Sequence, residues 1–138
     1  REPIMAPDAL VIQDPTLLYQ VDVFAGLKKG GYILINTNKS FEELGLADYV
    51  RDWPADRLLT VSATDIARKH VGRPVPNVPL LGGFAAASGL IQLESVIKAI
   101  HRKFGGKVAE GNIAAATEAF NTVRAEIDEA KRKENAHA

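Results

Sequence analysis

Residues 72–89 read GRPVPNVPLLGGFAAASG, and this stretch decides how the rest of the chain can pack. Its three prolines, Pro74, Pro76 and Pro79, favour an extended run, because each fixes φ and removes a backbone donor. The pair Gly82-Gly83 follows, and then a run of small residues that favours a helix in close contact with its neighbours. The pattern fits two structures: a rigid crossover packed against the core of an α/β domain, or a surface that docks a ligand or a partner.

Three short apolar runs before this stretch predict strands. They cover residues 9–12, 32–35 and 58–61. Continuous apolar runs of this length are typical of strands that are buried on both faces, as in parallel sheets.

Helical patterns alternate with the predicted strands. Ser40 and Glu43 have the spacing of a capping box at the start of a short helix. Apolar residues recur with helical spacing from Leu93 and again from Ile113. The predicted helices cover residues 16–28, 41–45, 66–71, 84–89, 93–104 and a long last segment around 113–127.

The order of these elements predicts an α/β fold: three layers, with a Rossmann-like, mostly parallel sheet and flanking helices. Three strands are fewer than the roughly five or six of a usual sheet of this kind. The chain also opens on Arg1 without an initiator methionine, so we expect the N-terminal part of the domain to be missing. We expect one incomplete α/β domain over residues 1–130 and a charged tail over 131–138 that frays.

The amino-acid composition limits the kinds of partner and of chemistry that we expect for this chain. Lysine plus arginine and aspartate plus glutamate number 17 each, so no net charge points to nucleic acid or to an anionic membrane as a partner. The chain has no cysteine and offers no disulfide, iron–sulfur ligand or thiolate nucleophile. No apolar run reaches the roughly 18 residues of a membrane span, and we expect a cytoplasmic protein.

Ligands of open α/β sheets bind beyond the carboxyl ends of the strands, and here those ends carry polar residues. Asn36, Thr37 and Lys39 offer donors for phosphate or amide groups. The alternative is that Asn36 and Asn38 satisfy turn backbone and that Ser40 only caps its helix. Asp14 and Asp65 also follow predicted strands, and each allows two interpretations. One is a role as an acid–base group, and the other is capping of a loop or of a helix start.

The sequence shows no catalytic motif. The three histidines, His70, His101 and His137, are far apart and lack the spacing of metal ligands. No nucleophile–base motif is present, and Gly82-Gly83 forms neither a GxGxxG motif nor a P-loop.

Three blocks together resemble one family. They are PDALVIQDPTLL at 7–18, VDVFAGLKKGGYILINTNKSFEELGL at 21–46 and VSATDIARKHVGRPVPNVPLLGGFAAASGLIQLESVIKAI at 61–100. They are similar to the gamma subunit, or gamma domain, of 2-oxoacid:ferredoxin oxidoreductases, above all the pyruvate type (pyruvate synthase). The resemblance covers about residues 3 to 128. Gamma domains normally begin with a glycine-rich GRGGQG segment, which this sequence lacks, in line with the expected truncation.

The resemblance implies a role in a multi-subunit enzyme that decarboxylates a 2-oxoacid with coenzyme A and reduces ferredoxin, or runs in reverse. It implies that thiamine diphosphate, Mg²⁺ and [4Fe–4S] clusters belong to alpha, beta and delta portions, and that this chain binds no cofactor alone. It implies packing on the thiamine-bearing subunits. From the composition, we expect no nucleic acid and no membrane as partners. The residues that it carries over as ligand or inter-subunit contacts are Asn36, Thr37, Lys39, Arg73, Asn77, Gly82 and Gly83.

Two alternatives stay open at this point. One is a free-standing α/β module that binds a nucleotide or a CoA-like ligand. The other is a component of an aryl-pyruvate oxidoreductase, which differs only in its substrate.

Overall fold

The computed structural model describes residues 4–6, 9–14, 16, 31–48, 50–51 and 53–136. The strands are β1 (Ile4–Ala6), β2 (Ala9–Ile12), β3 (Tyr32–Asn36) and β4 (Leu58–Val61). The helices are the short 3-10 helix η2 (Ala55–Arg57) and the α-helices α1 (Ala63–His70), α2 (Asn77–Ser88), α3 (Leu93–Lys103) and α4 (Gly106–Ala136). The predicted helix over 16–28 lies outside the described residues, except for Thr16.

The sheet confirms the predicted α/β class. Its order is β1-β2-β3-β4, with β2–β3 and β3–β4 parallel. Val11, Leu34 and Leu59 are aligned across the three parallel strands. β1 pairs antiparallel with β2. The sequence pattern did not predict β1, because a strand of three residues is too short to show a pattern.

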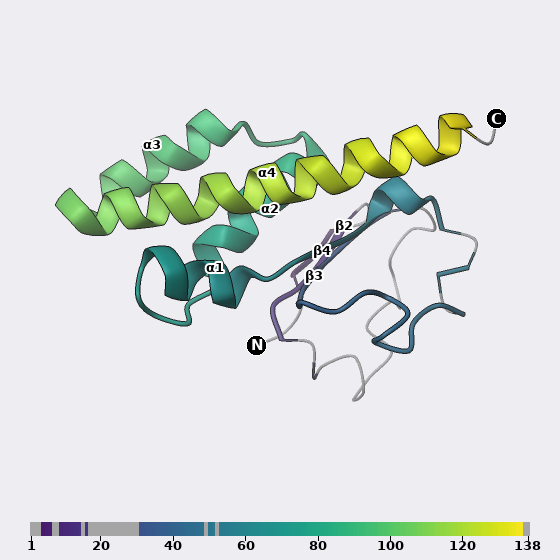
Figure 1. Ribbon diagram of the computed structural model, residues 1–138. Coiled ribbons are helices and arrows are strands. Elements are labelled where there is room, and N and C mark those ends of the chain that lie inside the picture. Colours follow the sequence, from purple (N-terminus) through teal and green to yellow (C-terminus); the bar gives the residue numbers. More distant parts are fainter. Residues whose placement is uncertain are drawn as a thin grey trace.

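Two layers cover the sheet (Figure 1), because alternate residues of each strand point to opposite faces. On one face, Leu34 and Val61 pack with residues of α2 and α4. On the other face, Ile33 and Ile35 pack with Leu44 and other residues of the segment 41–53. A third cluster joins α2, α3 and α4.

The helix α2 corrects our prediction for residues 72–89. We expected the extended run to reach Pro79 and the glycine pair to precede the helix. The helix instead begins at Asn77 and contains Pro79, Gly82 and Gly83. Pro79 is compatible with a helix here because it lies in the first turn, where backbone N–H groups have no partner within the helix.

The glycines of α2 allow close contact with two layers. A Cβ at Gly82 would overlap the carbonyl oxygen of Ala116 in α4. A Cβ at Gly83 would lie 3.2 Å from Val123 of α4 and 3.3 Å from Leu34 of β3. Helix α2 therefore packs against the core, as the first of the two alternatives predicts for this part, whereas residues 72–75 are exposed. Docking of a ligand or a partner on the exposed part stays a prediction.

Three other predicted elements differ in extent. Residues 41–45 form hydrogen-bonded turns instead of a helix, and Gly45 reverses the chain with a φ of 78°. Helix α1 begins at Ala63, three residues earlier than predicted, and ends at His70. Helix α4 continues to Ala136 and so includes most of the charged segment that begins at residue 131.

Candidate functional site

The carboxyl ends of the parallel strands meet at two adjoining pockets. The strand-end pocket has a volume of about 440 Å³ and is lined by Thr16, Asn36, Thr37, Asn38, Lys39, Leu44, Ser62, Thr64, Asp65 and Arg68. The proline-side pocket has a volume of about 520 Å³ and is lined by Gln13, Asp14, Asn36, Thr64, Pro74, Val75, Pro76 and Asn77. Asn36 and Thr64 form the wall between them.

Asn36 ties the strand ends together. Its side chain is 7% exposed. The Nδ2 group donates to the carbonyl of Gln13 and to the hydroxyl of Thr64, both at 2.9 Å. Its Oδ1 accepts the backbone N–H of Thr64 at 3.3 Å. The alternative that Asn36 satisfies its own turn is not what the structure shows, because its partners lie 23 and 28 residues away in the sequence, and the side chain is already occupied by them.

Thr37 and Lys39 lie at the mouth of the strand-end pocket. The Thr37 hydroxyl accepts the backbone N–H of Lys39 at 3.0 Å. Arg68 of α1 lines the same pocket and forms a surface ion pair with Asp65 at 3.1 Å. A lysine and an arginine thus line a pocket that also contains a carboxylate, an arrangement suited to a phosphate or carboxylate group that displaces Asp65 from Arg68.

The structure does not bring the remaining predicted site residues together in one site. Asn77 lines the proline-side pocket, whereas Arg73 is exposed and lines neither pocket. Gly82 and Gly83 are buried against α4 and the sheet, so they lie away from both pockets.

Ser40 and Glu43 form the two hydrogen bonds of the capping box that their spacing predicts. The Ser40 hydroxyl accepts the N–H of Glu43, and the Glu43 carboxylate accepts the N–H of Ser40. These bonds hold the pKa of Glu43 below its usual value. Asp14 accepts both the N–H and the hydroxyl of Thr16. Asp14 therefore stabilises the loop that follows β2, as one of the two sequence alternatives predicted.

Sequence reasoning missed one ion-pair cluster on the far side of α1. His70 Nε2 lies 2.7 Å from Oε1 of Glu118 in α4, and Lys69 Nζ lies 2.9 Å from the same oxygen. Hydrogen bonds from His70, and then from Lys69, hold the pKa of Glu118 below its usual value. Within the described residues, no group of three or more acidic, histidine or cysteine side chains could hold a metal ion.

The fold and these pockets define a class: an α/β domain with a polar, ligand-sized hollow at the carboxyl ends of its parallel strands. The family model of pyruvate ferredoxin/flavodoxin oxidoreductase matches residues 1–122, so this chain belongs to that family.

Relatives in archaea agree with this assignment. The "Pyruvate/ketoisovalerate oxidoreductases common subunit gamma" of Thermococcus kodakarensis is 47% identical over 118 residues, which are 86% of this chain and 62% of that protein. The "Pyruvate synthase subunit PorC" of Methanocaldococcus jannaschii is 42% identical over 86% of this chain and 61% of its own length. The chain thus spans about three fifths of the length of these relatives.

Solved structures show the same fold. The pyruvate oxidoreductase subunit PORC of Thermotoga maritima superposes with a TM-score of 0.72 and 30% identity, over 86% of this chain and 65% of that one. The keto/oxoacid ferredoxin oxidoreductase gamma subunit of Geobacter sulfurreducens has a TM-score of 0.60 at 24% identity, over 86% of this chain and 63% of that one, and supports the fold alone. The resemblance that the sequence blocks carried is confirmed.

One further finding concerns membranes. Among the helices of the described residues, none combines the length and the apolar character that crossing a membrane requires.

Proposed function

We propose that this chain is part of the gamma subunit of a 2-oxoacid:ferredoxin oxidoreductase that acts on pyruvate with coenzyme A. Its role is to pack on the subunits that carry thiamine diphosphate and Mg²⁺ and to present the loops at the carboxyl ends of its strands to them. The partners are alpha, beta and delta portions, and ferredoxin is reached through the complex. The single observation that carries this proposal is the 47% identity to a gamma subunit over most of the chain.

The chemistry of the chain supports a non-catalytic role. It has no cysteine, so it offers no thiolate to an iron–sulfur cluster. The acidic side chains Asp14 and Asp65 are engaged with Thr16 and Arg68 at the edge of the candidate site. We assign electron transfer and carbon chemistry to other subunits of the proposed complex, and we place that complex in the cytoplasm.

The test is purification of the protein in its native assembly, with the co-purifying subunits identified by mass. We expect larger subunits that contain thiamine diphosphate and iron–sulfur clusters. Purification of the protein as a compact monomer without such subunits would overturn the proposal.

Variants then test the loops. Asn77→Ala and Arg73→Ala remove exposed polar side chains beside the proline-side pocket and on the loop that leads to it. We expect lower acyl-CoA formation or weaker assembly of the complex. Arg102→Ala is the matched control, because it removes an exposed arginine from α3, far along the chain from the site. Unchanged activity and assembly in both loop variants would contradict this placement of the contact surface.

A second function has support from the geometry of the strand-end pocket. Its volume of about 440 Å³ and its basic side chains suit the phosphate end of a nucleotide or of a CoA-like ligand, which a free-standing binding module would hold. Calorimetric titration with coenzyme A tests it: binding by the isolated chain that is lost in Lys39→Ala would favour the module.

A further inference from the structure

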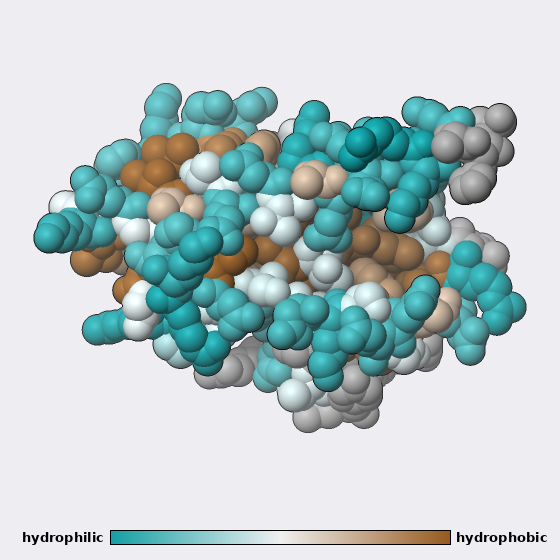
Figure 2. Space-filling view, in the orientation of Figure 1, coloured by the Kyte–Doolittle hydropathy of each residue, from teal (hydrophilic) through white to brown (hydrophobic). Residues whose placement is uncertain are grey.

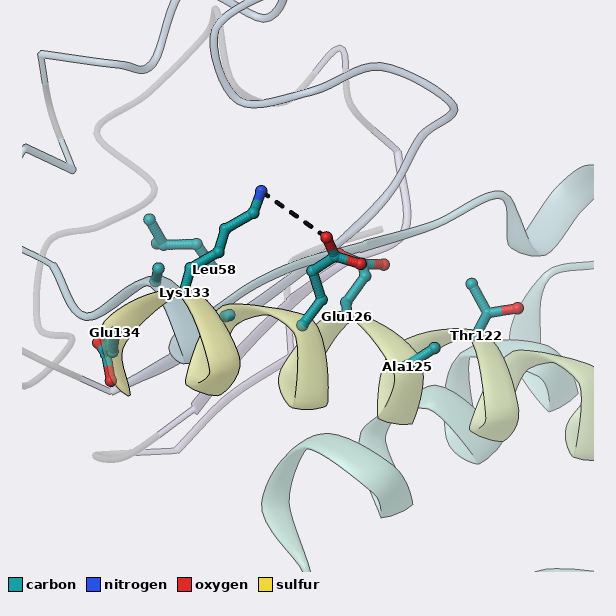
Figure 3. Close-up of a pocket in the computed structure, with 9 residues that line it drawn as sticks. Leu58, Thr122, Ala125, Glu126, Lys133 and Glu134 are labelled. Carbon is teal, nitrogen blue, oxygen red and sulfur yellow. Dashed lines mark ion pairs between the residues drawn. The ribbon is translucent and has the colours of Figure 1, made fainter. Parts of the chain in front are cut away.

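A groove runs between the C-terminal half of α4 and the outer side of β4. It has a volume of about 740 Å³ and is lined by Ala55, Leu58, Thr122, Ala125, Glu126, Glu129, Ala130, Lys133 and Glu134. Figure 2 shows hydrophobic surface between the two layers below this part of α4. Figure 3 shows Glu126 and Lys133 extending from the same side of the helix. Apolar and charged side chains together make the groove a candidate contact surface for another protein.

The outer edge of β4 is already hydrogen-bonded, so the groove is not suited to an added strand. β4 is the last strand of the described sheet. On its outer side, the N–H of Thr60 donates to Oε1 of Glu126 at 3.2 Å, and the N–H of Leu58 donates to the carbonyl oxygen of Ala55. A strand that adds to a sheet edge needs such amides to be free. An occupant of the groove therefore packs through side chains, as a helix does.

The end of α4 extends beyond the core. Val123 and Ile127 are the last buried residues of the described helix. The helix continues to Ala136, and residues 128–135 are exposed except for the partly buried Ala130. The family model matches residues 1–122, so this end of the helix lies outside the matched part. About two turns of exposed helix gain stability when they pack against another element.

The charges at this end of the helix complement themselves. Arg132 follows Glu129 by three residues, and the two side chains are 78% and 61% exposed. Their ion pair within the helix is 3.9 Å long, which is beyond hydrogen-bonding distance, so both groups keep their hydrogen-bonding capacity for another partner. When two such helices cross antiparallel at a point between Ala130 and Lys131, Glu129 of each copy meets Arg132 of the other.

Ala125 lies on the same face of the helix as this pair of charges. Ala125, Glu129 and Arg132 are spaced by four and then three positions, which is the spacing of the contact face between two packed helices. Ala125 is exposed and small, so it allows a second helix to approach closely. Ala125 and Glu129 also line the groove, and a second helix on this face therefore lies along it.

We propose that two copies of this chain associate through α4, with the C-terminal halves of the two helices antiparallel about a two-fold axis between Ala130 and Lys131. The contact contains two equivalent ion pairs, each between Glu129 of one copy and Arg132 of the other. A second copy fits this face better than an unrelated partner, because the same helix supplies both members of each pair. The association does not depend on the proposed function, since Ala125, Glu129 and Arg132 line neither the strand-end pocket nor the proline-side pocket.

Sedimentation velocity over a concentration series tests this association. We expect the purified chain to pass from one copy to two as its concentration rises, and high salt to weaken the association because exposed ion pairs are screened. Arg132→Glu places like charges opposite each other in both ion pairs, so we expect it to weaken the association by about tenfold or more. Lys131→Glu is the matched control, because it reverses an exposed charge on another side of the same helix.

A mixture of two variants separates the ion pairs from other effects of the substitutions. Glu129→Arg and Arg132→Glu each bring like charges together, so neither variant alone should associate. Mixed in equal amounts, they should form a pair with one copy of each, because opposite charges then face each other again. The proposal is overturned if the parent chain stays a single copy at every concentration, if Lys131→Glu weakens the association as much as Arg132→Glu, or if the mixture does not associate.

Discussion

Gly82 of α2 lies directly against the carbonyl oxygen of Ala116 in α4, with no room for a side chain between the two helices. The contact brings together two helices that are separated by α3 in the sequence. Close approach of backbone to backbone is the property for which only glycine is suited. The position of α4 on the sheet therefore depends on a missing side chain.

We expect Gly82→Ala to destabilise the fold. The added methyl group forces α2 and α4 apart, which costs about 2–3 kcal/mol and outweighs the roughly 1 kcal/mol that alanine gains over glycine in a helix. Urea denaturation followed by circular dichroism measures the loss. Gly105→Ala is the control, because nothing lies within 4 Å of the position of its added Cβ. Equal stability of the two variants would contradict the close packing.

Asn36→Ala should destabilise the carboxyl edge of the sheet. The change leaves the partly buried carbonyl of Gln13 and the N–H of Thr64 without this partner, at a cost of about 2 kcal/mol. Asn38→Ala, at an exposed position in the same loop, should be close to neutral. Thermal unfolding of both variants distinguishes the residue that joins the strands from the one that only faces the pocket. Similar melting temperatures would argue against the bridging role.

Glu126 should make the folded state less stable as the pH rises. Its pKa of about 7 lies above the usual value of 4.5, so its contribution is fully present below pH 4.5 and is lost toward pH 7. Because the carboxyl is partly exposed, we expect a loss of about 2 kcal/mol, less than the full difference between the two values would give. Urea midpoints at pH 5 and pH 7.5 should differ in the parent chain by more than in Glu126→Gln. A parallel change in both proteins would contradict this assignment.

The contribution of Glu118 to stability depends on pH in the direction opposite to that of Glu126. Hydrogen bonds from His70 and Lys69 lower its pKa, so its contribution is present above pH 4.5 and is lost as the pH falls through the lowered value. Glu118→Gln should therefore make stability less sensitive to acid below pH 4.5. Glu110→Gln, at an exposed position of the same helix, is the matched control. Acid unfolding curves that coincide for Glu118→Gln and the parent chain would show that the pair contributes nothing.

The local patterns of the sequence predicted the elements that rest on short-range physics. The apolar runs that became β2, β3 and β4 and the stripe that became α3 needed no knowledge of their neighbours. The predicted start of α2 was wrong. Prolines favour an extended chain, but Pro79 lies in the first turn of the helix, where a backbone N–H has no partner within the helix and its absence costs nothing.

The candidate site was predictable as a location and not as a set of contacts. The sheet topology alone brings Asn36, Thr37 and Lys39 to one edge, and the strand-end pocket contains all three. The hydrogen bonds of Asn36 reach across 23 and 28 residues to Gln13 and Thr64, and no local pattern specifies them. Glu126 looks like any solvent-facing glutamate of a helix, because its burial depends on β4 and η2. Whether the pocket residues contact a ligand or a subunit stays a prediction.

The position of α2 in the chain has a consequence for how the protein forms during synthesis. This helix is buried by β3 and β4, which precede it, and by α3 and α4, which follow it. A ribosome that adds roughly 5–20 residues per second completes α2 seconds before the residues of α4 that cover it have left the exit tunnel. During that interval the alanine- and glycine-rich surface of α2 is open to water and to other nascent chains. Chaperone contact is therefore expected to be strongest on the ribosome-bound chain that ends between α2 and α4.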